Sequence, residues 1–185
     1  MNEIQEVFSV LALSGSLRRA SSNSALLQVA AVLAPPHLQI RQYRQWAALP
    51  AFNPDDEGGE VESVLHFRAA VAAADAILIA SPEYAHGVPG AFKNALDWLV
   101  GSGELINKPV AALNASGRAL HAQSSLLDTL AMMNADVVLP ASLTVALPTN
   151  QLDAAAMLAE APIVEGLHQA LAALGAHLSH IAQPH

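Results

Sequence analysis

The chain has 185 residues, of which 53% are hydrophobic and only 13% charged, and its formal net charge is -8. An acidic chain repels a phosphate backbone and an anionic lipid surface, so nucleic acid and membranes are excluded as expected partners. Charged residues are too few to cover the apolar surface, so we expect part of it to pack against another subunit, in a homodimer or a homotetramer. The length predicts a single domain over residues 1–185.

The absence of cysteine excludes disulfides, thiolate nucleophiles and iron–sulfur or zinc sites built on cysteine. The N-terminus has no basic region followed by an apolar stretch, and the longest apolar run, at 69–80, is interrupted by Asp75. We therefore expect a soluble protein of the cytoplasm. His177, His180 and His185 lie near the C-terminus, where we expect a solvated tail and no metal site.

Strands and helices are predicted to alternate along the chain. Strands are predicted at 7–14, 37–43, 75–81 and 109–116, mostly from short apolar runs typical of burial on both faces, and a last strand is predicted near 136–146. Apolar residues spaced three and four apart predict helices at 22–34, 61–74, 91–100, 121–134 and 162–180. This alternation predicts right-handed crossovers and an α/β fold, a doubly wound five-stranded parallel sheet with helices on both faces.

The one long connection, at 44–60, holds Trp46 and Phe52. These rings have three possible roles: to cap a pocket, to pack on a partner or to pin the connection to its own domain. We favour the last.

The loop after the first strand, "SGSLRRASSN" (14–23), has the composition of a phosphate site. It ends where a helix begins, and a helix N-terminus offers free N–H groups and a partial positive charge to an anion. Arg18 adds a planar fork that matches phosphate oxygens, and charged hydrogen bonds contribute roughly 1.5–3 kcal/mol each. Helix capping is the alternative role for Ser21, Ser22 or Asn23. The hydroxyl groups come from Ser14, Ser16, Ser21, Ser22 and Ser24.

Two further loops are expected at the same carboxyl edge of the sheet, where open parallel sheets bind ligands. In "SPEYAHGVPG" (81–90), Tyr84 and two glycines would let a flat ring approach the backbone closely. Glu83 is the only carboxylate there, which argues against paired acid–base chemistry, and His86 has either a proton-transfer role or a solvent-facing one. In "NASGRALHAQ" (114–123), Ser116, Gly117 and Arg118 are further edge contacts, or a simple strand-to-helix turn.

The spacing of these motifs resembles the NADPH-dependent FMN reductase family, flavodoxin-like proteins that include quinone, chromate and azo-dye reductases. The resemblance rests on "SGSLRRASSN" and, some sixty residues later, "SPEYAHGVPGAFKNALDWL", and it extends over nearly the whole chain. It implies that the phosphate of FMN is bound by Ser16, Arg18, Ser21 or Ser22, and Asn23. It implies that the isoalloxazine ring is edged by Pro82, Glu83, Tyr84, Ala85, His86 and Gly87, with further contacts from Ser116 and Gly117.

The chain departs from the family pattern at two places. The family has asparagine after the tyrosine, where this chain has Ala85, and a glycine pair in the fourth-strand loop, where this chain has "ALHA" (119–122). The segment "AFKNALDWL" (91–99) resembles the family helix that packs against a second subunit.

By this resemblance the protein is an NAD(P)H-dependent oxidoreductase. Electrons would pass from NADPH or NADH through bound FMN to a quinone-like, flavin or other small-molecule acceptor. Because the flavin performs the chemistry, no catalytic side chain and no metal is expected. The alternative is a flavodoxin-like electron carrier, or flavin-binding module, with no turnover of its own. A phosphate-ester enzyme would need a nucleophile or metal carboxylates, which the sequence does not offer.

Overall fold

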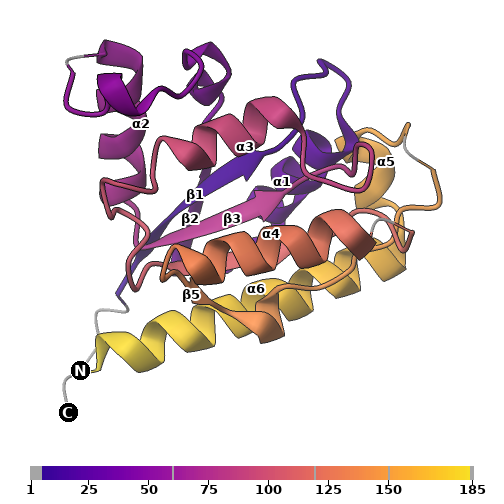
Figure 1. Ribbon diagram of the computed structural model, residues 1–185. Coiled ribbons are helices and arrows are strands. Elements are labelled where there is room, and N and C mark those ends of the chain that lie inside the picture. The colour runs from indigo at the N-terminus through magenta and orange to yellow at the C-terminus, as the bar shows by residue number, and fades with distance from the viewer. Residues whose placement is uncertain (1–5, 60, 119, 150, 184–185) are drawn as a thin grey trace.

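A five-stranded, all-parallel sheet forms the centre of the protein in the computed structural model, which describes residues 6–59, 61–118, 120–149 and 151–183 (Figure 1). The strand order is β2-β1-β3-β4-β5. The prediction of a doubly wound, flavodoxin-like α/β sheet is therefore confirmed. The strands are β1 (Phe8–Ser14), β2 (Leu38–Gln42), β3 (Ala76–Ala80), β4 (Pro109–Leu113) and β5 (Asp136–Val137).

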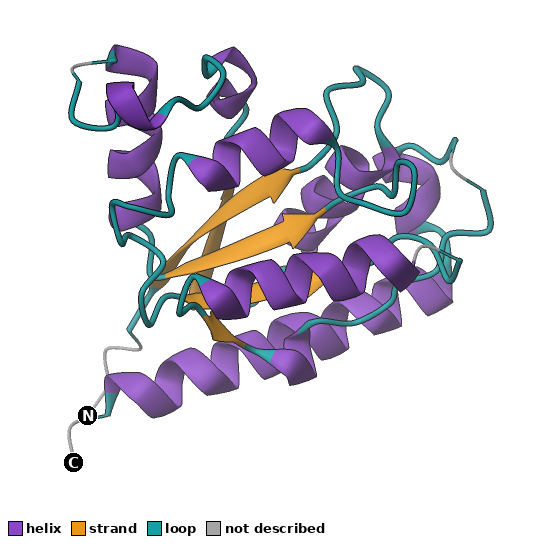
Figure 2. Ribbon diagram, viewed as in Figure 1, coloured by secondary structure: helices purple, strands orange, loops and turns teal. Residues whose placement is uncertain are grey.

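Helices cover both faces of this sheet (Figure 2). Successive residues of a strand point to opposite faces, so Val10 and Ala12 pack with α1, α5 and α6, whereas Leu11 and Leu13 pack with α2, α3 and α4. The nearly continuous apolar runs of the inner strands follow from burial on both sides. The helices are α1 (Ser22–Leu33), α2 (Glu62–Ala72), α3 (Gly90–Asp97), α4 (Leu120–Met132), α5 (Ala154–Leu158) and α6 (Ala161–Ala182).

The last strand is much shorter than the predicted strand at 136–146. After two residues β5 gives way to a 3-10 turn at Leu139–Ala141, because Pro140 has no N–H for a sheet ladder. The Ser142 hydroxyl then accepts a bond from the Ala112 N–H at 3.1 Å, in place of a strand partner. The chain returns to β4's edge through a bridge between Asn114 and Thr144. The prediction was therefore wrong in the length of this strand.

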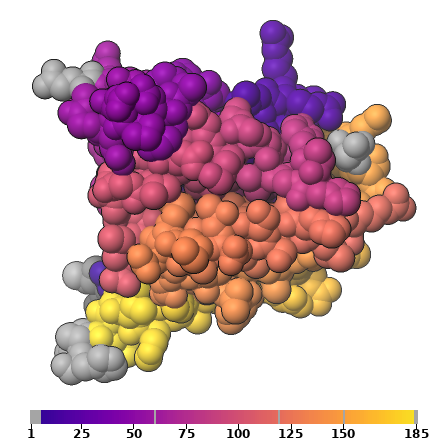
Figure 3. Space-filling model, in the orientation of Figure 1, coloured from indigo at the N-terminus to yellow at the C-terminus, as the bar shows by residue number. Residues whose placement is uncertain are grey.

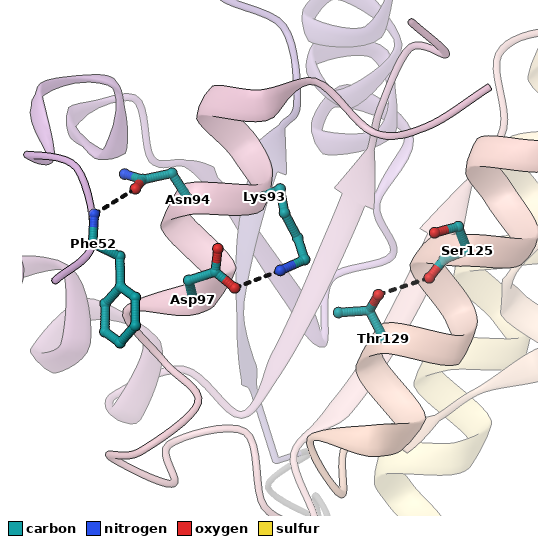
Figure 4. A network of polar contacts seen from close by, with 6 residues as sticks. All are labelled: Phe52, Lys93, Asn94, Asp97, Ser125 and Thr129. Carbon is teal, nitrogen blue, oxygen red and sulfur yellow. Dashed lines mark hydrogen bonds and ion pairs between the residues drawn. The ribbon is translucent and has the colours of Figure 1, made fainter. Parts of the chain in front are cut away.

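The long connection after β2 is pinned to its own domain, as we favoured. Trp46 is buried and meets Phe92 of α3 edge-on, with ring centroids 5.5 Å apart, and Phe52 meets Trp98 at 5.0 Å. Figure 4 shows the backbone N–H of Phe52 donating to Asn94 Oδ1, at 2.7 Å. Short 3-10 turns at Gln45–Ala48 and Pro54–Asp56 lie within the connection.

The sequence analysis did not predict α5, which spans one turn. Its N-cap is Asp153, whose Oδ1 accepts a bond from the Ala156 N–H at 2.8 Å. Within the described ranges, no helix combines the length and apolar character needed to cross a bilayer.

The direction in which successive strands are added to the sheet reverses between β1 and β3, which are adjacent and parallel. The crossover from β1 runs through α1 to β2 on one side, whereas β3 is followed by α3 and β4 on the other. The loops that leave β1 and β3 therefore part at the carboxyl edge, beyond the arrowheads in Figure 1. Ligands of doubly wound sheets bind at such a switch point.

Candidate functional site

A cavity of about 390 Å³ lies at this carboxyl edge, within the range of small-molecule sites. We call it the carboxyl-edge cavity. Its wall comes from the loops after β1, β3 and β4 and from Leu147 and Thr149, beyond β5. In the space-filling view the indigo loop after β1 projects from the top of the molecule, beside the magenta residues that follow β3 (Figure 3).

The cavity brings together most of the residues predicted from the sequence. Ala85, His86, Gly87 and Gly117 are not part of its wall, although each is within three residues of one that is. The predicted residues that line it are Ser16, Arg18, Ser21, Ser22, Asn23, Pro82, Glu83, Tyr84 and Ser116.

The serines of the first loop divide into structural and cavity-lining groups. Ser14 is buried and accepts bonds from the Ser24 hydroxyl at 2.9 Å and from the Ser16 N–H at 3.3 Å. Ser21 is the N-cap of α1, and its hydroxyl accepts from the Ser24 N–H at 3.3 Å. The capping alternative therefore holds for Ser21, which also lines the cavity, whereas Ser22 and Asn23 are free of the N-cap role.

The first turn of α1 contains a buried acceptor that has no hydrogen-bond partner among the described residues. Asn23 is 8% exposed and lines the cavity, and its Oδ1 is a buried acceptor without a hydrogen-bond partner among the described residues. A buried polar atom costs free energy unless it is bonded, so a ligand that offers a hydroxyl donor there is favoured. The amide can also turn to present its N–H₂ group to an anion.

The charge of the wall is opposite to that of the chain. Arg18 and Arg118 belong to it from the loops after β1 and β4, while Glu83 is the one carboxylate among the described residues of the wall. The formal charge of the chain is -8, so a cationic wall at a helix N-terminus is a local arrangement. It suits a phosphate group, which a guanidinium can bind through two parallel hydrogen bonds.

The loops after β1 and β3 touch at Gly15. Its N–H donates to the Ala80 carbonyl at 2.8 Å. A Cβ at this position would lie 2.3 Å from Ser81 Oγ and 2.8 Å from Ser81 Cβ. Only glycine allows this approach to Ser81, which is part of the cavity wall.

The loop after β3 contains a tight turn with unusual backbone. The Tyr84 N–H donates to the Gly87 carbonyl at 2.9 Å, and the Gly87 N–H donates back at 3.0 Å. Between them Ala85 and His86 have φ values of +49° and +64°, the left-handed region. Glu83, just before the turn, accepts a bond on Oε2 from the Ala122 N–H of α4 at 2.9 Å. Glu83 thus has a structural partner as well as a place in the wall.

Several residues of the wall were not predicted from the sequence. Ser81 and Asn114 are the first residues after β3 and β4, so their position at the strand ends could have identified them. Asn114 Oδ1 accepts a bond from the Ser116 N–H at 3.0 Å, which shapes the loop after β4. No sequence signal marks Leu147 or Thr149, because only the return of the chain past β5 brings them to the wall.

The titratable groups of Tyr43, which is buried, and of Lys108, which is half-buried, lie outside the cavity wall. Burial raises the pKa of Tyr43, whose hydroxyl lies 2.7 Å from His66 Nδ1. Burial lowers the pKa of Lys108, against an opposing effect of Asp75. His177, which we expected in a solvated tail, instead lies in α6 with its Nε2 2.6 Å from Asp136 Oδ2, and His185 is outside the described residues. No group of three or more metal-ligating side chains occurs in the described part of the chain.

Comparison with known proteins gives a consistent set of relatives. Residues 8–150 match the family model of NADPH-dependent FMN reductase. The chain is 37% identical over 171 residues to an NAD(P)H-dependent FMN reductase of Pseudomonas aeruginosa, covering 89% of this chain and 92% of that one. It is 33% identical over 98 residues to a quinone reductase of Escherichia coli, covering 52% of each chain.

A solved structure with a similar fold is a flavoenzyme, the NAD(P)H:(acceptor) oxidoreductase of Paracoccus denitrificans. The two chains are 28% identical with a TM-score of 0.76, and the match covers 94% of this chain and 98% of that one. An azoreductase of Bacillus anthracis has the same fold, with a TM-score of 0.60 at 17% identity, over 92% of this chain and 100% of that one.

Proposed function

The chain belongs to the NADPH-dependent FMN reductase family, and from this premise we propose that the carboxyl-edge cavity is where it binds FMN. The phosphate would lie at the first turn of α1, against Ser16, Arg18 and Ser22. The isoalloxazine ring would lie toward the loops after β3 and β4. The observation that carries this placement is the cationic wall of the cavity at the α1 N-terminus, in a chain that is otherwise acidic.

The residues present fit FMN at both of its polar parts. The helix N-terminus and the Arg18 guanidinium suit a phosphomonoester. The unbonded Asn23 Oδ1 suits a hydroxyl of the ribityl chain, which would satisfy an acceptor that is otherwise buried without a partner. A ring beside Tyr84, whose side chain is 52% exposed, would cover apolar surface.

The protein is an NAD(P)H-dependent oxidoreductase of the flavin and quinone type. FMN, when bound, would supply two-electron chemistry: NAD(P)H gives up a hydride and becomes NAD(P)⁺, and a quinone acceptor takes the two electrons and the proton of that hydride, with a second proton from water, to become a hydroquinone. The side chains of the cavity would then have to bind FMN and orient its ring. Arg18 and the α1 N-terminus would hold the phosphate end of FMN. Glu83, through its hydrogen bond from Ala122, would set the position of the loop beside the ring.

The predicted residues outside the wall have a role in this proposal through their backbone. Ala85, His86 and Gly87 form the turn that follows Tyr84, and Gly117 follows Ser116, so backbone groups of both loops would edge the ring.

We also propose that a single domain over residues 1–185 works in the cytoplasm as a homodimer or homotetramer. Large apolar side chains left exposed, such as Val100 at 61% and Met132 at 77%, support the oligomer. Sedimentation analysis tests it, and a monomer would contradict it.

An anaerobic spectroscopic experiment tests the function. Purified protein loaded with FMN is mixed with NADPH or NADH, and the visible absorbance of the flavin is followed in a stopped-flow instrument. We expect rapid bleaching, followed by recovery of the absorbance when a benzoquinone is added. An electron carrier would keep its colour until a separate reductase was supplied. Absence of saturable FMN uptake by the folded protein would contradict the cofactor site itself.

A further inference from the structure

The turn from Tyr84 to Gly87 adopts a backbone that its sequence does not favour. Two residues with φ above zero between paired backbone hydrogen bonds make a type I′ turn, for which Asn-Gly is the usual sequence. Here the two positions hold Ala85 and His86, whose Cβ atoms crowd the backbone in the left-handed region. Strained backbone of this kind persists where surrounding contacts hold it. Some contact outside the turn is therefore required.

Two contacts from the first turn of α4 meet this requirement. The imidazole rings of His86 and His121 are stacked, with centroids 4.4 Å apart and planes inclined by 3°. Next along α4, the Ala122 N–H donates to Glu83 Oε2 at 2.9 Å. Adjacent residues of one helix thus hold the loop on both sides of Tyr84.

The stack lies beside the cavity wall and outside it. Glu83 and Tyr84 line the cavity, whereas neither His86 nor His121 does. Both rings are exposed, so burial in a core does not explain why they meet. Parallel rings direct their nitrogen lone pairs within their own planes, so the pair does not converge on a metal ion. What the contact does is fix the distance between the loop after β3 and the start of α4.

We propose that the His86–His121 stack and the Glu83–Ala122 hydrogen bond form a clasp that positions the Tyr84–Gly87 turn at the ring end of the carboxyl-edge cavity. His121 is then a positioning residue, which acts on the flavin through the turn. The inference rests on the proposed binding of FMN in this cavity. It assigns a role to His121 and Ala122 in the first turn of α4. Any planar ring at position 121 that can stack on His86 would serve, because stacking needs a π face and no particular nitrogen.

The test compares H121A with H121F, the variant that keeps a planar ring. In the protein without flavin, amide hydrogen exchange of residues 85–88 reports whether the turn is held. With flavin, quenching of fluorescence gives Kd for riboflavin, which has the ring and no phosphate, and for FMN. Removing a stacked pair is expected to raise both Kd values about 3- to 10-fold.

We expect H121A to speed exchange in the turn and to weaken riboflavin and FMN equally, so that the ratio of their Kd values stays at the wild-type value. H121F should restore both readouts. H168A removes an exposed histidine of α6 and should change neither. H86N removes the other ring and places at φ +64° a residue that tolerates it, so a folding failure of H121A still leaves a usable variant.

Wild-type exchange and wild-type riboflavin affinity in both H121A and H86N would overturn the clasp. Equal losses in H121A and H121F would also overturn it, because an imidazole nitrogen, and no stack, would then be responsible. Failure of the wild-type protein to bind any flavin would contradict the proposed function instead. The exchange data on the flavin-free protein would in that case still judge whether the stack holds the turn.

Discussion

The loops after β1 and after β3 border the same cavity, but they are held in different ways. In the first loop the serine hydroxyls bond to backbone N–H groups two or three residues away, as in Ser16 to Arg18 and Ser21 to Ser24. In the second loop Glu83 is bonded to Ala122, thirty-nine positions away in the chain. The proposed phosphate end of the cavity is thus held by local interactions, whereas the proposed ring end depends on a neighbouring helix.

This difference separates the two ends in their response to mutation. A change in the first loop should weaken binding of the phosphate group and leave binding of the ring unchanged. A change at the second loop should act on the ring and, through α4, on stability. Substitution at the point where the two loops touch should affect both.

The largest effect is expected at that contact, from Gly15→Val. A side chain there would overlap Ser81 and force the two loops apart, because even its Cβ would lie 2.8 Å from Ser81 Cβ. We expect a loss of about 3 kcal/mol in the free energy of unfolding, seen as a fall of roughly 6–12 °C in Tm, together with weaker FMN binding. Thermal denaturation measures it. Gly58→Val is the matched control, since no atom lies within 4 Å of a Cβ at Gly58. Equal Tm values for the two variants would show that the loops do not meet at Gly15.

Arg18→Ala should affect the phosphate end alone. Loss of the charged hydrogen bonds to the phosphate is expected to cost about 2 kcal/mol of binding, a roughly 30-fold rise in Kd for FMN. Riboflavin has no phosphate, so its Kd should stay the same. Fluorescence titration gives both values, and Arg19→Ala, one position along the same exposed loop but outside the wall, is the control. If Arg18→Ala and Arg19→Ala behave alike, Arg18 has no part in the site.

Glu83→Ala should act at the ring end. The Ala122 N–H loses its acceptor, and we expect about 1 kcal/mol less stability in urea denaturation, with a few-fold rise in Kd for riboflavin. Glu83→Gln keeps a carbonyl oxygen in reach and should retain most of both. A Gln variant as impaired as the Ala variant would mean that the negative charge, and not the tether to α4, is what counts.

The smallest effect is a gain, from Ala85→Asn. Asparagine tolerates the left-handed backbone better than alanine, so relief of strain at φ +49° should add about 0.5 kcal/mol to the free energy of unfolding. Thermal denaturation should show a Tm higher by roughly 1–2 °C. Ala51→Asn, in an exposed segment outside the left-handed region, should give no such gain. A lower Tm for Ala85→Asn would show that the turn carries no strain to relieve.

Local sequence patterns predicted the framework well. The boundaries of β1, β2, β3 and α1 agree with the structure within one or two residues, because these segments are regular, mostly apolar and bounded by polar or proline residues. The prediction was wrong for the last strand, where Pro140 interrupts an apolar pattern. It also missed α5, whose single turn is too short to show a helical period.

For the site, the sequence by itself determined the first loop. Its hydroxyl groups and Arg18 lie between a strand and a helix, and the hydrogen bonds that shape the loop join residues two or three positions apart. It also indicated the second and third loops, because the ends of parallel strands meet at one edge. Only the tertiary structure decided which of those residues line the cavity, that Glu83 is bonded to α4, and that His86 lies against His121. Contacts between segments more than thirty residues apart depend on how helices pack on the sheet, which no local spacing records.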